Sequence, residues 1–137
     1  MDPGLELQLI WSEDDLYMFQ CRALSGAFSG MAEFYAPRTT PKRLADALEG
    51  FPKEVGERRE LELGTLDPAS DLGGVRLSLG MPHAGAATLR VELRNGWAER
   101  QETAEVVLFV EPSAIDEFVR QLRAMRLEQG SGARLQA

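Results

Sequence analysis

The chain has 137 residues, of which 44% are hydrophobic and 27% are charged, and its formal net charge is −7. These values are those of one globular domain long enough to bury a core, and the acidity argues against nucleic acid or an anionic membrane as the main partner. The one cysteine, Cys21, excludes an internal disulfide, and no Cys/His cluster is present for structural zinc. No signal peptide or apolar membrane span is recognisable, so we expect a cytoplasmic protein.

The first third of the chain predicts three strands joined by short turns. Apolar and polar residues alternate over Leu5–Trp11, an extended pattern resumes over Leu16–Ala23, and a third strand is expected over Phe28–Ala36. The polar corner Ser12–Asp15 and the Leu24-Ser25-Gly26 break favour turns between them. The three strands should form an antiparallel meander.

A short helix is expected next, from a Thr40 N-cap with Pro41 at the first helical position. Gly50 and Pro52 should end it. Three further strands are then predicted, over 60–63, 75–81 and 89–93, with a hairpin at Pro82–Gly85 and a turn at Asn95-Gly96.

The segment from Glu102 to Arg126 carries the clearest pattern in the chain. Residues Thr103–Glu111 alternate as a strand, and the apolar pair Val107 and Phe109 on its second face predicts a central strand covered on both sides. Pro112 ends that strand, and Ser113 is the expected N-cap of an amphipathic helix.

The helical segment after Pro37 resembles the one after Pro112, so each half of the chain ends in a strand, a proline corner and a helix. We therefore predict an α+β fold in the order βββ-α-ββββ-α, with one twisted antiparallel sheet of about six to seven strands and two helices packed on one face. Residues 1–128 should form a single domain, and the Gly-rich segment 129–137 a flexible C-terminal tail.

Three groups of side chains could carry chemistry, and each has a simpler explanation. His83, the one histidine, is a possible acid–base group but is expected to be exposed in a turn. Cys21 could be activated by Arg22, but its strand face favours a buried, inert thiol. The Glu13–Asp15 cluster lacks the spacing of a calcium loop and favours a solvated turn. The sequence names no catalytic residue, metal ligand or cofactor.

A mixed-charge sheet face is the strongest candidate for function. Arg76, Arg90, Glu92 and Arg94 should alternate outward on two adjacent strands, with Glu33 and Tyr35 on the corresponding face of the third strand. This face is either a solvated sheet surface with cross-strand charge pairs or a site for a partner.

The segments Phe28–Tyr35, Leu44–Pro52, Gly73–Leu77 and Ala104–Met125 resemble a group of small uncharacterised bacterial α+β proteins. Proteins of this size, acidity and layout are similar to immunity proteins of toxin systems. The resemblance implies a protein-binding role and assigns no functional residue.

We therefore expect a non-enzymatic, protein-binding domain, with toxin neutralisation as one form of that binding. The alternative is a small-ligand-binding or sensory domain with a pocket between sheet and helices. An enzyme is the third hypothesis. A homodimer through an unpaired edge strand is also compatible with the pattern.

Overall fold

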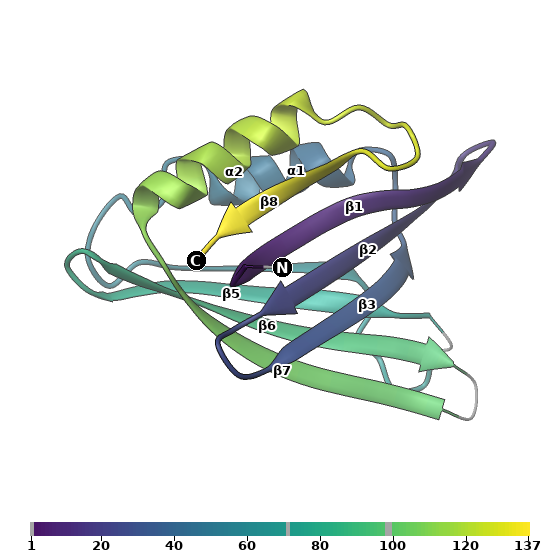
Figure 1. Cartoon of the computed structure of the whole chain (residues 1–137), viewed down its shortest axis with the longest axis horizontal. Helices are drawn as coiled ribbons and strands as arrows, with labels where there is room; N and C mark the ends of the chain where they lie inside the picture. Colours follow the sequence, from purple (N-terminus) through teal and green to yellow (C-terminus); the bar gives the residue numbers. More distant parts are fainter. Residues whose placement is uncertain (1, 71, 98–99) are drawn as a thin grey trace.

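The computed structural model describes residues 2–70, 72–97 and 100–137, and within these ranges the chain forms two helices and eight strands in two antiparallel sheets (Figure 1). Sheet A contains, in spatial order, β3 (Ser29–Tyr35), β2 (Leu16–Leu24), β1 (Gly4–Glu13) and β8 (Gly132–Gln136). Sheet B contains, in spatial order, β4 (Arg58–Gly64), β5 (Gly74–His83), β6 (Ala86–Trp97) and β7 (Arg100–Val110). The helices are α1 (Thr40–Leu48) and α2 (Pro112–Ala124).

The α+β class, the antiparallel pairing and the predicted order of elements as far as α2 are confirmed, but the prediction of one sheet with six to seven strands is wrong. β3 is the end strand of its sheet, and at its open edge it bonds to a side chain from β6 and not to a further strand. The Asn95 side chain accepts a hydrogen bond from the Glu33 N–H at 3.0 Å and donates one to the Met31 carbonyl at 2.8 Å. Asn95 itself lies within β6, and the predicted turn at Asn95-Gly96 is wrong.

The prediction of a flexible tail over 129–137 is also wrong. Residues Gly132–Gln136 form β8, which pairs antiparallel with β1 and buries Ala133 and Leu135. The alternation is too short to be recognised as a strand by itself. The segment forms a strand because β1 offers an open edge and an apolar inner face.

The two halves of the chain are structural repeats that exchange their last strands. β1–β2–β3–α1–β4 and β5–β6–β7–α2–β8 have the same order, yet β4 pairs with β5 and β8 pairs with β1. The pairing register gives the equivalences: Leu7 lies between Cys21 and Ala133, as Leu77 lies between Val91 and Leu61. The similar strand–corner–helix segments of the sequence are parts of these repeats.

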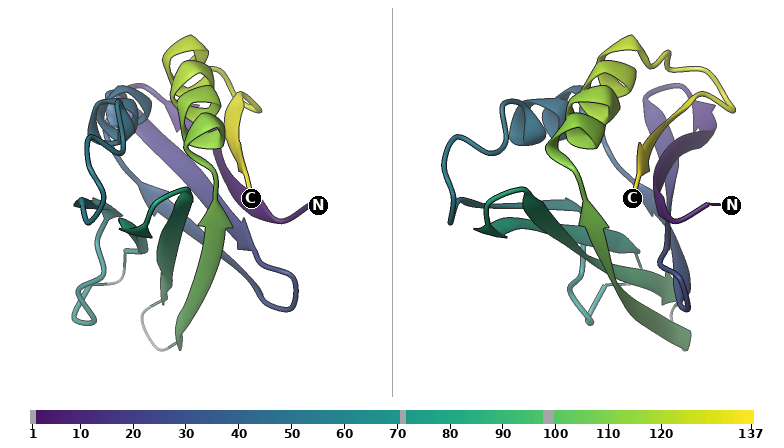
Figure 2. Two further views of the ribbon diagram at one scale, coloured as in Figure 1. Left: turned by 90° about the vertical axis from the view of Figure 1, so that its left-hand side faces the viewer. Right: turned by 60° about the vertical axis from the view of Figure 1, so that its left-hand side comes forward.

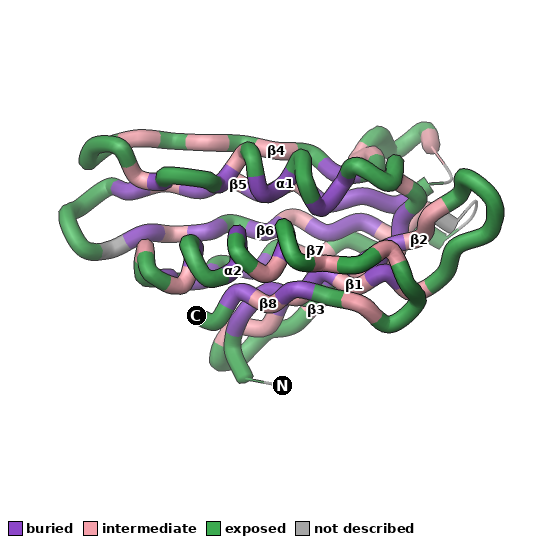
Figure 3. Tube along the Cα trace, turned by 90° about the horizontal axis from the view of Figure 1, so that it is seen from above, coloured by how far each residue is buried: buried purple, intermediate pink, exposed green. Residues whose placement is uncertain are grey.

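The inner faces of both sheets and the apolar stripes of both helices form a common core. Leu44 and Leu48 of α1 and Phe118 and Leu122 of α2 are buried in it. The helices lie side by side over the space between the two sheets, which splay apart beneath them (Figure 2). Viewed from above, buried positions recur along the strands of both sheets, between intermediate and exposed ones (Figure 3).

Three local expectations are corrected. The N-cap of α1 is Thr39, and Thr40 and Pro41 are its first two helical residues. β7 lies at the edge of sheet B and not at its centre, and Val107 and Phe109 are exposed. Ser113 is the second residue of α2, whose N-cap is Glu111. Neither described helix is long and apolar enough to cross a membrane.

Candidate functional site

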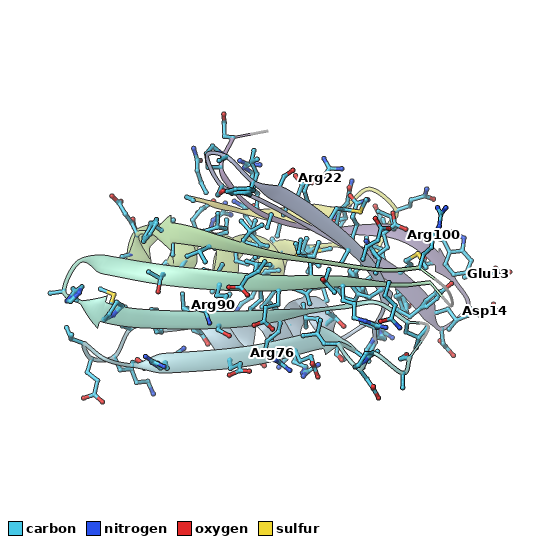
Figure 4. The ribbon with its side chains drawn as sticks, turned by 90° about the horizontal axis from the view of Figure 1, so that it is seen from below. Glu13, Asp14, Arg22, Arg76, Arg90 and Arg100 are labelled. Carbon is cyan, nitrogen blue, oxygen red and sulfur yellow. The ribbon has the colours of Figure 1, made fainter. Side chains whose placement is uncertain are left out.

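The outer face of sheet B, which is turned away from the helices, brings together three of the six residues predicted for the interaction face. Arg76, Arg90 and Glu92 lie there on β5 and β6, and Figure 4 shows both arginines on this side of the sheet. The strand register arranges the face in rows of four. Counted from the end at the β5–β6 hairpin, the rows are Arg58–Gly80–Thr88–Phe109, Glu60–Ser78–Arg90–Val107, and Glu62–Arg76–Glu92–Glu105.

Ion pairs occupy the charged rows. Arg76 contacts Glu60, Glu62 and Glu92 at 3.3, 3.4 and 3.3 Å, and Arg90 contacts Glu105 at 3.2 Å. All these side chains are partly or largely exposed, so the pairs contribute little to stability individually. They link neighbouring strands of the sheet, and because four glutamates surround the two arginines, the charged part of the face keeps a net negative charge.

Arg94, the fourth predicted residue of these strands, is not available to a partner. Its side chain is 3% exposed because the loop between β4 and β5 covers it. The guanidinium donates to the carbonyls of Leu72 at 2.8 Å, Ser70 at 2.9 Å and Pro68 at 3.3 Å. Arg94 is therefore a structural residue that holds this loop against the sheet.

Glu33 and Tyr35 lie on the outer face of sheet A, apart from the arginines. Glu33 accepts a hydrogen bond from Gln20 at 3.4 Å, and Tyr35 contacts Trp11 edge to face with ring centroids 6.4 Å apart. The prediction that these residues share one face with Arg76 and Arg90 assumed one sheet. Since the strands belong to two sheets, the predicted face is divided.

An apolar patch at the β7 edge of the same outer face was not predicted. Phe109 is 73% exposed and Val107, two residues before it, is 40% exposed. Exposed aromatic side chains on an edge strand are typical of interaction sites. The signal was present in the sequence: Glu105 and Glu111 share this strand face, and their charges indicate exposure.

A groove of about 700 Å³ adjoins Phe109 on the other side of the β7 edge. Its walls come from β7, the N-terminal half of α2, β8 and the β5–β6 hairpin, and they include Ala87, Val110, Ala114, Glu117 and Arg134. Hydrogen bonds from Arg120 hold the pKa of the Glu117 carboxyl at about 2, so Glu117 is ionised at neutral pH. The groove is thus lined by both apolar and charged side chains.

The remaining candidate side chains show the burial or exposure that the sequence predicts, although His83 and Glu13 are the last residues of strands. Cys21 is fully buried, and burial raises the pKa of its thiol to about 12, which makes it inert at neutral pH. His83 is exposed at the end of β5. Glu13 and Asp14 are exposed at the β1–β2 hairpin, and within the described ranges no three metal-binding side chains gather.

Comparisons of the chain with protein-family models, with curated proteins and with solved structures gave no match.

Proposed function

We propose that this protein is a protein-binding domain whose partner docks on the β7 edge, covering Phe109 and Val107. The observation that carries the proposal is the exposure of Phe109, an aromatic side chain on an edge strand between an ion-paired sheet face and an apolar groove. Burying large aromatic side chains is the main source of affinity in many interfaces, and surrounding charged residues set specificity.

The net charge of the chain indicates which class of protein the partner belongs to. A net charge of −7 favours association with a basic protein, because opposite charge speeds encounter. Together with the resemblance to immunity proteins, this supports toxin neutralisation as the form of binding. Growth rescue on co-expression with a toxin encoded beside this gene tests that form.

Phe28 provides a matched control for the binding test. It is also 73% exposed, but it lies in the turn between β2 and β3, at the edge of the other sheet. In pull-downs from the source cells, the wild type and Phe28→Ala should capture the same stoichiometric partner, and Phe109→Ala should lose it. Failure to capture a stoichiometric partner with the wild type contradicts the proposal, as does capture that Phe109→Ala leaves unchanged.

The groove supports small-ligand binding as a second candidate function. Its volume of about 700 Å³ falls within the usual range for ligand sites, and it lies between the sheets and α2. Ser113 is exposed on its wall, so Ser113→Trp should fill it. Compounds that raise the melting temperature of the wild type but not of Ser113→Trp would favour this candidate.

A further inference from the structure

The two repeats carry different side chains in the outer-face row that contains Phe109. In the first repeat, Trp11 pairs across the strands with Met18, and Met18 pairs with Tyr35. In the second repeat, the corresponding row is Gly80, Thr88 and Phe109. A register shift between Leu9 and Trp11 places Trp11 one residue further along its strand, so Gly80 takes the place of Trp11 in this row, and Phe109 takes the place of Tyr35.

The first repeat shows what fills this place. Trp11 meets Tyr35 edge to face across Met18, with the ring planes at 76°. Tyr35 is consequently 40% exposed, whereas Phe109, which has only Gly80 at the position of Trp11, is 73% exposed. Edge-to-face aromatic pairs are favourable beyond the area that they bury.

A side chain at Gly80 would meet no clash at its Cβ atom. A Cβ atom at Gly80 would lie 3.8 Å from the Thr88 Oγ1 and 4.0 Å from the Arg58 Cγ, which are ordinary contact distances. Arg58 pairs with Gly80 across β4 and β5, so it borders the place opposite Phe109. A ring lying over Gly80 would have the Phe109 ring on one side and an arginine side chain on the other, which suits an aromatic group.

We infer that this place, bounded by Arg58, Gly80, Thr88 and Phe109, is a receptor for an aromatic side chain of the partner protein. The inference rests on the proposed function and specifies its chemistry: the partner supplies in trans the ring that Trp11 supplies in cis in the first repeat. Val107, one row further along the outer face, extends the apolar contact beyond the ring.

N-acetyl-L-tryptophanamide is the direct probe. Titrated into the ¹⁵N-labelled chain, it should cause saturable shifts of the Gly80, Thr88 and Phe109 amide signals, and larger ones than N-acetyl-L-leucinamide causes. Phe109→Ala should abolish these shifts, while Phe28→Ala should keep them. Absence of the shifts, or shifts that Phe109→Ala does not change, overturns the inference. Shifts of the same amides on changing the protein concentration alone also overturn it, because a second copy of the chain then occupies the place.

A variant that fills the place from within separates this inference from the proposed function. Gly80→Trp should fold, since its Cβ meets no clash, and should lose both the probe shifts and the captured partner. Gly26→Trp, at an open position in the β2–β3 turn, is the matched control and should keep both. If Gly80→Trp still captures a partner that Phe109→Ala loses, the aromatic receptor is wrong and the proposed function stands. If the probe binds at Gly80 but the wild type captures no partner, the receptor stands and the proposed function fails.

Discussion

At the scale of single residues, burial decides the chemistry of the side chains that the sequence leaves ambiguous. The alternating patterns of their strands predict that Cys21 faces inward and Arg94 outward, but only the packing around each side chain shows whether it is accessible. The inner face of sheet A buries Cys21, and the loop between β4 and β5 buries Arg94. One becomes an inert thiol and the other a structural cation.

Cys21 gives a prediction on reactivity and pH. At pH 8 the folded protein should not react with a maleimide reagent, and it should react fully in denaturant. The thiol stays protonated up to a pKa of about 12 in the folded chain, whereas its ordinary pKa is 9.0. The unfolded chain therefore releases this proton first, so stability should fall as pH rises from about 9 towards 12. Cys21→Ala should reduce that slope in urea-unfolding measurements, and an equal slope would contradict the prediction.

Arg94 gives a prediction on stability. Arg94→Met removes the donors to three loop carbonyls and should lower the free energy of unfolding by roughly 1–3 kcal/mol. It should also speed hydrogen exchange in the loop that Arg94 holds. Arg90→Met is the matched control on the same strand face, where the side chain is 58% exposed, and should change stability by less than about 0.5 kcal/mol. Equal effects of the two substitutions would show that Arg94 has no special role.

At the scale of elements, the fold depends on the close crossing of β3 over β6 and β7. Gly30 lies at this crossing, and a Cβ atom there would lie 2.7 Å from the Leu93 Cδ1 and 2.9 Å from the Ala104 Cβ. The missing side chain lets the two sheets meet at one end while they diverge at the other. Asn95 then satisfies the β3 edge at the same crossing.

Gly30→Ala tests this crossing. The added methyl group overpacks the contact between sheets and should lower the free energy of unfolding by about 1–3 kcal/mol. Gly26→Ala, which meets nothing within 4 Å, should have little effect. Urea unfolding of both variants measures the difference, and equal stability would mean that the crossing relaxes without cost.

At the scale of the whole molecule, the exchanged strands make the two repeats one cooperative unit. β4 completes the sheet of the second repeat and β8 completes that of the first, so neither repeat holds its full sheet without the other. Leu63 in β4 and Leu135 in β8 are both buried, and each pairs across to the first strand of the other repeat.

Leu63→Ala and Leu135→Ala test this cooperativity. Each should lower the free energy of unfolding by roughly 2–5 kcal/mol. Each variant should still unfold in one transition, seen identically by circular dichroism and by tryptophan fluorescence. A separate early transition in either variant would show that the repeats unfold independently. Little effect of Leu135→Ala would instead support the flexible tail that the sequence predicts.

The sequence by itself determined the local elements of this protein. Strands are predicted by the alternation of apolar residues in Leu5–Trp11 and 75–81, and a helix is predicted by the helical spacing of apolar residues from Ile115 to Leu122. These patterns are local because they reflect only which side of each element is buried. The same patterns placed Cys21 inside and Arg76, Arg90 and Glu92 on a shared outer face.

Only the tertiary structure decided which strands are neighbours. Pairing β8 with β1 joins residues from opposite ends of the chain, and Asn95 and Gly30 make close contacts where β3 crosses the other sheet. Apolar and polar residues can alternate in the same way in a central and in an edge strand. The pattern around Phe109 therefore could not show that this residue lies at an open edge. The candidate site was therefore visible in the sequence as a face, and its apolar centre became visible only when the strands were placed side by side.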